Sequence, residues 1–258
     1  MVDHKFASSP ELSNAILQTI AYADIFDFPL KGSEIYRYLV GQRVSQQDVE
    51  QAIQANRLIS YVQGFYMLPG REDLAATRRQ RESLAKQLWP LALKWSRVIS
   101  RIPFVRMVAV TGSLAMDNVE KGVDIDYLIV TEVGRLWLCR AQVLLAGRLA
   151  ARQGVVICPN YLISIKHLEF QDRSLYTAHE IAQMVPLAGL NVYACIRERN
   201  AWVEDFLPNA GGAPTEPEFT LQRKAAALRR PAAEAILNAA PFTAIERWEM
   251  KRKTQKLT

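Results

Sequence analysis

Residues 105–131 read VRMVAVTGSLAMDNVEKGVDIDYLIVT, and this stretch decides the fold. It opens with a short apolar run, 105–110, whose Val-rich composition favours a β-strand. The run ends at Gly112-Ser113. A glycine allows the backbone to approach a ligand closely, and a serine can offer both its hydroxyl and its N–H to phosphate oxygens. The sequence therefore predicts a strand followed by a turn that is suited to binding an anion.

The second apolar run, 123–131, carries two carboxylates. Residues two apart on a strand share a face, so Asp124 and Asp126 are expected to project side by side. Two neighbouring carboxylates repel each other unless a cation lies between them. A magnesium-like divalent ion prefers oxygen ligands of this kind. The alternative, a turn glycine with two surface aspartates, leaves the acidic pair inside a very apolar strand unexplained.

Gly112, Ser113, Asp124 and Asp126 together resemble the motif of the polymerase-β-like nucleotidyltransferase superfamily. The motif covers about 25 residues, and the surrounding pattern extends the resemblance to roughly 105–164. The resemblance implies that Gly112 and Ser113 bind the phosphates of a nucleoside triphosphate. It also implies that Asp124 and Asp126 are catalytic and hold Mg²⁺ or Mn²⁺. The expected reaction moves a nucleoside monophosphate to an acceptor hydroxyl and releases pyrophosphate.

One element of that motif is missing. Active members generally supply a third carboxylate from a later strand, but the next predicted strand, 154–164, contains no acid. Asn160 is expected to occupy the position, where its carbonyl oxygen could be a weak ligand but not a base. Glu169 and Asp172 lie further along the chain, and either could supply a substitute for the missing carboxylate. Three hypotheses stay open: a relaxed metal site, a substitute carboxylate, or a catalytically degenerate protein that binds a nucleotide, DNA or a partner as a regulator. We expect an enzyme.

The N-terminal residues, 1–72, have a different pattern. Apolar residues at helical spacing predict three helices, and Gln63-Gly64 lies between two strand-like runs, 58–62 and 65–68. Three helices followed by a hairpin resemble a winged helix-turn-helix, which implies a winged-helix-like domain.

DNA binding by this domain has weak support from its charges. The third helix, 46–56, contains Asp48 and Glu50 but no lysine or arginine. Basic side chains make most of the phosphate contacts in nucleic-acid complexes. The alternative is a domain that packs on a neighbour or binds a protein.

The remaining segments are expected to be mainly helical. The charge run 78–81 lies on a predicted connecting helix that bends near Pro90, and a run of this kind usually marks a solvated face. Later helices are predicted at 175–187, 192–206 and 219–237, and Tyr176, Glu180 and Tyr193 are expected by analogy to line the acceptor cleft.

The expected fold class is α+β, with a small mixed-sheet core. Its four parts are a winged-helix-like domain (1–72), a connecting helix (73–103), the nucleotidyltransferase core (104–170) and a C-terminal helical region with a basic tail (171–258).

The composition is that of a folded protein. Of 258 residues, 50% are apolar and 22% charged, which excludes a disordered chain. Lysine and arginine outnumber aspartate and glutamate by 32 to 26, and the whole excess lies after residue 221. A basic tail beside a site of nucleotide transfer makes RNA a reasonable acceptor. A solubilising or partner-binding tail is the alternative.

The chain has no signal-peptide pattern at its start and no apolar run near the roughly 18 residues of a membrane span. Three scattered cysteines predict neither a disulfide framework nor a zinc finger. We therefore expect a cytoplasmic protein that does not associate with membranes. The motif does not specify the acceptor, the base of the nucleotide or the oligomeric state.

Overall fold

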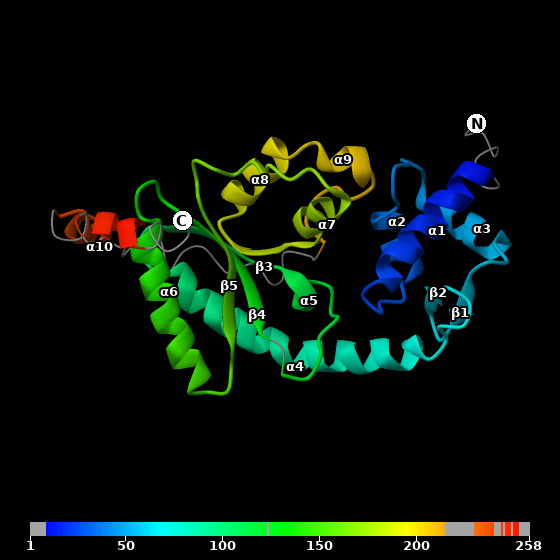
Figure 1. Ribbon diagram of the computed structural model, residues 1–258, viewed down its shortest axis with the longest axis horizontal. Coiled ribbons are helices and arrows are strands. Elements are labelled where there is room, and N and C mark those ends of the chain that lie inside the picture. The colour runs from blue at the N-terminus through cyan, green and yellow to red at the C-terminus, as the bar shows by residue number, and fades with distance from the viewer. Residues whose placement is uncertain are drawn as a thin grey trace.

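The computed structural model describes residues 9–122, 124–214 and 230–239, together with residues 244, 246–248 and 250–252. It is a mixed α/β structure with two groups of elements joined by one long helix, α4 (Leu74–Ser100) (Figure 1). The predicted helix over 219–237 is described only from residue 230 onward, and Val123 and the end of the basic tail lie outside the described residues. No helix in the described part of the chain is both long and apolar enough to cross a membrane.

The N-terminal unit consists of three helices and a two-stranded antiparallel sheet, in the order that the sequence predicted. Local signals account for its boundaries. Ser9 and Ser45 each accept a hydrogen bond from the backbone of the first helical turn, and Gln63 and Gly64 both have positive φ, as a tight hairpin turn requires. The elements are α1 (Pro10–Asp24), α2 (Gly32–Arg37), α3 (Gln46–Ala55), β1 (Ser60–Val62) and β2 (Phe65–Met67).

Helix α4 belongs to both groups of elements. Its first turns are buried against the N-terminal unit, and Trp95 and Ile99 near its end are buried under the larger sheet. Pro90 lies inside the helix. The expectation that 78–81 forms a solvated face is wrong for Arg78, which is 1% exposed. Its guanidinium donates to Glu34, Glu82 and the Pro29 carbonyl, so burial is compensated by ion pairs and a hydrogen bond.

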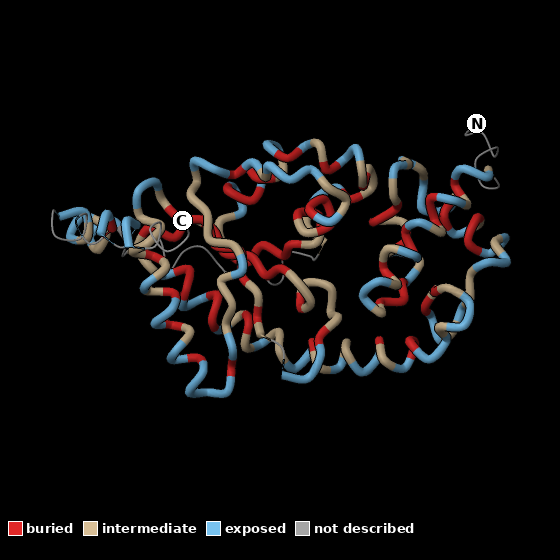
Figure 2. Tube along the Cα trace, viewed as in Figure 1, coloured by how far each residue is buried: buried red, intermediate tan, exposed pale blue. Residues whose placement is uncertain are grey.

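The larger sheet has the strand order β5-β4-β3-β6 and is mixed. The two central strands pair antiparallel, β4 and β5 pair parallel, and β6 pairs antiparallel with β3. The strands are β3 (Val105–Val110), β4 (Ile125–Thr131), β5 (Ile157–Ser164) and β6 (Val185–Ala188). Buried residues are concentrated along β3 and β4 (Figure 2). The predicted strand at 105–110 is therefore a central strand of the sheet.

Helices cover both faces of this sheet. Ile125, Tyr127 and Ile129 pack with α4 and α6 (Leu136–Ala151) in one core cluster. Leu128 and Val130 point to the other face and pack with α7 (Leu175–Gln183) and α8 (Leu190–Arg199). This alternation along β4 is the two-residue period of a strand that is buried on both sides.

Two predicted C-terminal helices differ from the structure. The segment 175–187 was expected to be one helix, but α7 ends at Gln183 and β6 follows as an edge strand on β3. An edge strand tolerates Pro186, and pairing with a distant strand outweighs the local apolar pattern. The segment 192–206 is likewise divided into α8 and α9 (Val203–Phe206). The side-chain amide of Asn200 lies at that break and donates to the carbonyls of Ile196 and Leu168.

The described part of the C-terminal region contacts the start of β3 and of α6. Helix α10 (Arg230–Leu237) contains Pro231 in its first turn, and its Glu234 accepts two hydrogen bonds from the Arg106 guanidinium. Glu246 accepts hydrogen bonds from the backbone N–H groups of Trp137 and Leu138 at the start of α6. A carboxylate at this end of a helix stabilises it by satisfying free N–H groups.

Candidate functional site

The turn after β3 packs against an aspartate of the neighbouring strand. Gly112 begins the short helix α5 (Gly112–Ala115) with a φ of +65°. A Cβ at this position would lie 2.5 Å from Oδ2 of Asp126, which is closer than non-bonded atoms can approach. The Thr111 N–H also donates to the Asp126 carbonyl. Glycine is therefore required at position 112 for two reasons, its backbone conformation and the space that the carboxylate occupies.

The two aspartates of the motif lie together, as predicted. Asp126 is on β4 and Asp124 immediately precedes it. Partial burial, and then the negative charge of Asp124, raise the pKa of the Asp126 carboxyl. The carboxylate pair is thus an electrostatically unfavourable arrangement that a cation would relieve.

The third position of the site is held by Cys158. One carboxylate oxygen from each aspartate and the Cys158 Sγ lie within 4.8 Å of one another. Burial, followed by the hydrogen bond and charge of Asp126, raises the pKa of the Cys158 thiol to about 11. At neutral pH the thiol is therefore protonated and donates to Asp126. It provides neither a carboxylate nor a base.

The strand register pairs Asp126 with Cys158, whereas the sequence predicted Asn160 at the third position. Asp126 pairs with Cys158 and Leu128 pairs with Tyr161, so β5 contains one extra residue between these pairs. This irregularity changes the alternation, and Asn160 is exposed. The strand position opposite Asp126 belongs to Cys158, which sequence alone could not reveal because the bulge is not encoded in the strand's apolar pattern.

The two downstream acids have other partners. Glu169 forms an ion pair with Arg173 at 3.1 Å. Asp172 accepts hydrogen bonds from the hydroxyls of Ser174 and Thr177 at the start of α7, and these bonds lower the pKa of its carboxyl. Neither carboxylate is directed to the Asp124–Asp126 pair.

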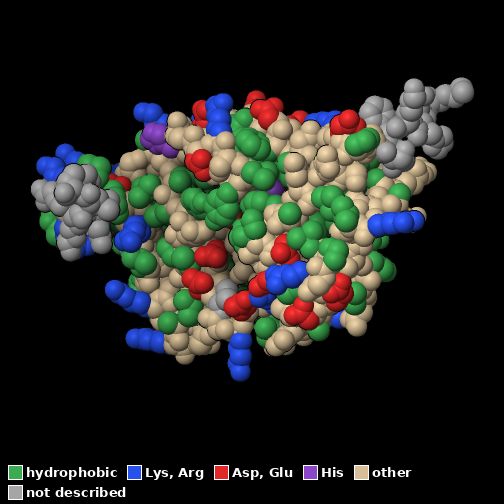
Figure 3. All heavy atoms as spheres, turned by 45° about the vertical axis from the view of Figure 1, so that its right-hand side comes forward, with side chains coloured by type: hydrophobic (Ala, Val, Ile, Leu, Met, Phe, Trp, Pro, Cys, Tyr) green, Lys and Arg blue, Asp and Glu red, His purple; other side chains and the backbone are tan. Residues whose placement is uncertain are grey.

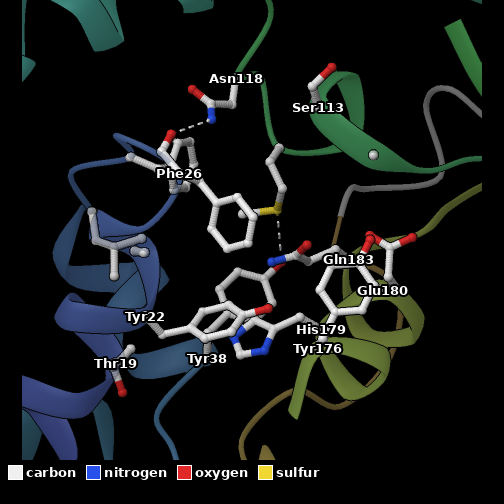
Figure 4. A pocket seen from close by; sticks show the side chains of 15 residues that line it. Thr19, Tyr22, Phe26, Tyr38, Ser113, Asn118, Tyr176, His179, Glu180 and Gln183 are labelled. Atoms are coloured by element: carbon white, nitrogen blue, oxygen red, sulfur yellow. Dashed lines mark hydrogen bonds between the residues drawn. The ribbon is translucent and has the colours of Figure 1, made fainter. Parts of the chain in front are cut away.

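A cavity of about 220 Å³ lies beside the site, between the N-terminal unit and the core. Figure 4 shows side chains of α1, together with Phe26 and Tyr38, on one side of it and side chains of α7 on the other. Gly112 and Ser113 belong to its wall, which connects the cavity to the predicted phosphate-binding turn. The lining residues are Thr19, Tyr22, Ala23, Phe26, Phe28, Leu30, Tyr38, Gly112, Ser113, Met116, Asn118, Tyr176, His179, Glu180 and Gln183.

Glu180 is the acidic residue of the cavity wall. Its Oε2 is buried, and no described residue donates a hydrogen bond to that atom. Burial, and then the charge of Asp126, raise the pKa of its carboxyl. Tyr176 also lines this cavity. Tyr193, the third residue expected at an acceptor cleft, does not, and it is 7% exposed within the core cluster between the sheet and α8.

Acidic side chains are prominent near the hollow in the middle of the face that Figure 3 shows.

Comparison with protein-family models, with curated proteins and with solved structures found no match to this chain. The assignment of a function therefore depends on the geometry of the site.

Proposed function

We propose that the protein is a metal-dependent nucleotidyltransferase that moves a nucleoside monophosphate from a nucleoside triphosphate to an acceptor hydroxyl. The observation that carries the proposal is the packing of the Gly112 turn against Asp126 on the adjacent antiparallel strand, with Asp124 beside it. This contact joins the two halves of the motif in space. A glycine turn and an unrelated surface acid would have no reason to be in contact.

The residues present fit a divalent cation. Asp124 and Asp126 supply hard oxygen ligands, which Mg²⁺ and Mn²⁺ prefer, and the missing Cβ of Gly112 allows the Asp126 carboxylate to lie against the turn. When bound, the ion supplies Lewis-acid stabilisation of negative charge on the phosphate oxygens. Gly112 and Ser113 hold the triphosphate next to the two carboxylates, and the cavity wall keeps the acceptor on the other side of that turn.

The reaction forms one bond and breaks one bond. The acceptor hydroxyl oxygen attacks the α-phosphorus, the bond from that phosphorus to the bridging oxygen of pyrophosphate breaks, and pyrophosphate leaves with the electron pair. The hydroxyl proton is released to water. Positioning of the two reactants provides much of the rate enhancement in such a transfer.

The test uses α-labelled ATP, GTP, CTP and UTP with Mg²⁺ or Mn²⁺, alone, with total RNA and with a small-molecule cell extract. We expect a labelled acceptor with the wild type and with Glu169→Gln, a control that removes one exposed carboxylate. We expect none with Asp124→Asn/Asp126→Asn. Equal labelling by the double variant would contradict the proposal.

A second candidate is a degenerate transferase that binds a nucleotide, nucleic acid or partner as a regulator. The presence of Cys158 opposite Asp126, where active members have a third carboxylate, favours it. Metal-dependent nucleotide binding without any transfer, in the same assay, is the result that this candidate predicts. The N-terminal unit, winged-helix-like in its element order, would then carry the recognition.

A further inference from the structure

The residues that line the cavity beside the Gly112 turn indicate the chemical class of its ligand, which the Gly-Ser and Asp-x-Asp motif does not. We propose that it binds a small organic cation, an amine with a flat apolar body, through an aromatic wall and the Glu180 carboxylate. The ligand class follows from the cavity alone. That this amine also carries the acceptor hydroxyl rests on the proposed function.

The walls of the cavity are largely aromatic. Tyr22 of α1 stacks on His179 of α7 with ring centroids 4.1 Å apart, and the Tyr38 ring lies 5.8 Å from the same imidazole. Phe26, at the end of α1, adds a further ring to the wall, 5.5 Å from Tyr22. Aromatic faces carry partial negative charge, so they attract flat apolar groups and cations.

The charge of the cavity is negative. Glu180 contributes a carboxylate oxygen that is buried and accepts no hydrogen bond from a described residue, and no lysine or arginine belongs to the described lining. Two guanidinium groups lie close to wall residues but already have partners. Arg81 donates to the Phe26 carbonyl and to Asn118 Oδ1 and pairs with Glu120, and Arg37 donates to the carbonyls of Gly211 and Gly212. A buried carboxylate without a partner is costly, and a ligand ammonium would satisfy it.

The size of the cavity limits the ligand to a small molecule. A cavity of about 150 Å³ in another protein holds one benzene molecule. The volume of about 220 Å³ here admits one substituted ring but not a folded RNA or a protein domain. An ammonium group attached to such a ring would contact the aromatic wall and reach Glu180. A carboxylate in the place of that ammonium would be repelled by Glu180.

The binding experiment uses three probes that share a phenol ring and a two-carbon chain. Tyramine ends in an ammonium, para-ethylphenol in a methyl group and para-hydroxyphenylpropionate in a carboxylate. Each is titrated into the full-length protein at neutral pH by calorimetry and ligand-observed NMR. We expect tyramine to bind at least about tenfold more tightly than either analogue.

The variants assign this preference to the cavity. Glu180→Gln keeps the shape of the side chain and breaks no described hydrogen bond at Oε2, and we expect it to abolish the preference for tyramine. Tyr22→Leu is expected to weaken the binding of tyramine and of para-ethylphenol to the same extent, because it removes one ring of the aromatic wall. Glu169→Gln removes an exposed charge that does not belong to the cavity lining, and this variant should bind all three probes as the wild type does.

Four results would overturn the inference: equal binding of the three probes, no binding of any probe, loss of the preference in Glu169→Gln, or retention of the preference in Glu180→Gln. Displacement of tyramine by magnesium-ATP would assign the cavity to the nucleotide base, and displacement by a single-stranded RNA oligonucleotide would assign it to an RNA end. Either displacement also contradicts the proposal. Failure of the labelling assay, with tyramine still bound, would refute the proposed function and leave this site in place.

Discussion

The missing Cβ of Gly112 leaves the space that Oδ2 of Asp126 occupies, since a methyl group there would lie 2.5 Å from that oxygen. Gly112→Ala is therefore expected to displace the carboxylate and to weaken Mn²⁺-dependent nucleotide binding by at least about tenfold. The positive φ adds a folding cost of roughly 1–2 kcal/mol. Calorimetric titration with a non-hydrolysable ATP analogue measures the first effect, and urea unfolding measures the second.

Gly134→Ala is the matched control, because Gly134 has a φ of +67° and its added Cβ would meet no described atom within 4 Å. It should show the same folding cost and normal nucleotide binding. If both variants bind nucleotide equally well, the contact between Gly112 and Asp126 is not important for the site.

The strand register leads to a second prediction. Cys158→Asp places a carboxylate opposite Asp126, so we expect tighter Mn²⁺ binding, by about tenfold or more, and a lower melting temperature without the ion. Asn160→Asp adds the same charge at an exposed position and should change neither quantity. Calorimetry and thermal unfolding with and without Mn²⁺ measure both effects. A stronger response to Asn160→Asp would contradict the observed register.

Arg78 gives the third prediction. Its buried guanidinium donates to Glu34 and lies 3.8 Å from the centroid of the Phe28 ring, so it attaches α4 to the N-terminal unit. Arg78→Met removes a buried cation that pairs with two half-buried acids, Glu34 and Glu82, and among the described residues leaves only Glu82 with another ion-pair partner, Lys31. We expect the change to cost about 3 kcal/mol of stability in urea unfolding. Arg79→Met, one residue along on the exposed face, should cost less than about 0.5 kcal/mol. Equal effects of the two variants would show that burial of Arg78 is not decisive.

The pH dependence of stability gives the fourth prediction. Burial lowers the pKa of His179 from 6.5 to about 4, and its Nδ1–H donates to the Leu175 carbonyl. The unfolded chain therefore binds a proton below pH 6.5 that the folded chain does not bind until about pH 4. This contribution to stability is complete above pH 6.5 and is lost as the pH falls toward 4, by roughly 3 kcal/mol at most.

The raised pKa values of Asp126 and Glu180 act in the opposite direction, because the folded state then binds the proton more readily. The comparison that isolates His179 is the difference between wild type and His179→Gln in urea unfolding at pH 7.5 and pH 5. We expect the wild type to lose more stability than the variant over this interval. An equal loss in both proteins would exclude the buried imidazole as the cause.

Local features of the fold were predictable from sequence because local chemistry determines them. Ser9 and Ser45 are helix caps, and the Gln63-Gly64 turn, the strand at 105–110 and the acidic pair at 124 and 126 all have short-range signals. The chemistry of the Gly112 turn could likewise be predicted, but its contact with Asp126 required the antiparallel pairing of β3 and β4.

Features that depend on distant parts of the chain were not predictable. The bulge that puts Cys158 rather than Asn160 opposite Asp126 arises from pairing with β4, and the edge strand β6 forms only because β3 is available to it. The cavity is a stronger case. Tyr22 and Glu180 are separated by most of the chain, and no pattern in either segment indicates that they share a wall.

The continuity of α4 has a geometric consequence. The N-terminal unit and the sheet are attached to opposite ends of the same helix, so the length of that helix fixes their relative rotation about its axis. One residue inserted near the middle of α4 would turn its first half by about 100° and advance it by about 1.5 Å. That rotation would carry Tyr22 and Phe26 away from α7 and leave Gly112 and Asp126 in contact. The number of residues in α4 thus determines whether the two walls of the cavity face each other, although no residue of α4 belongs to the described lining.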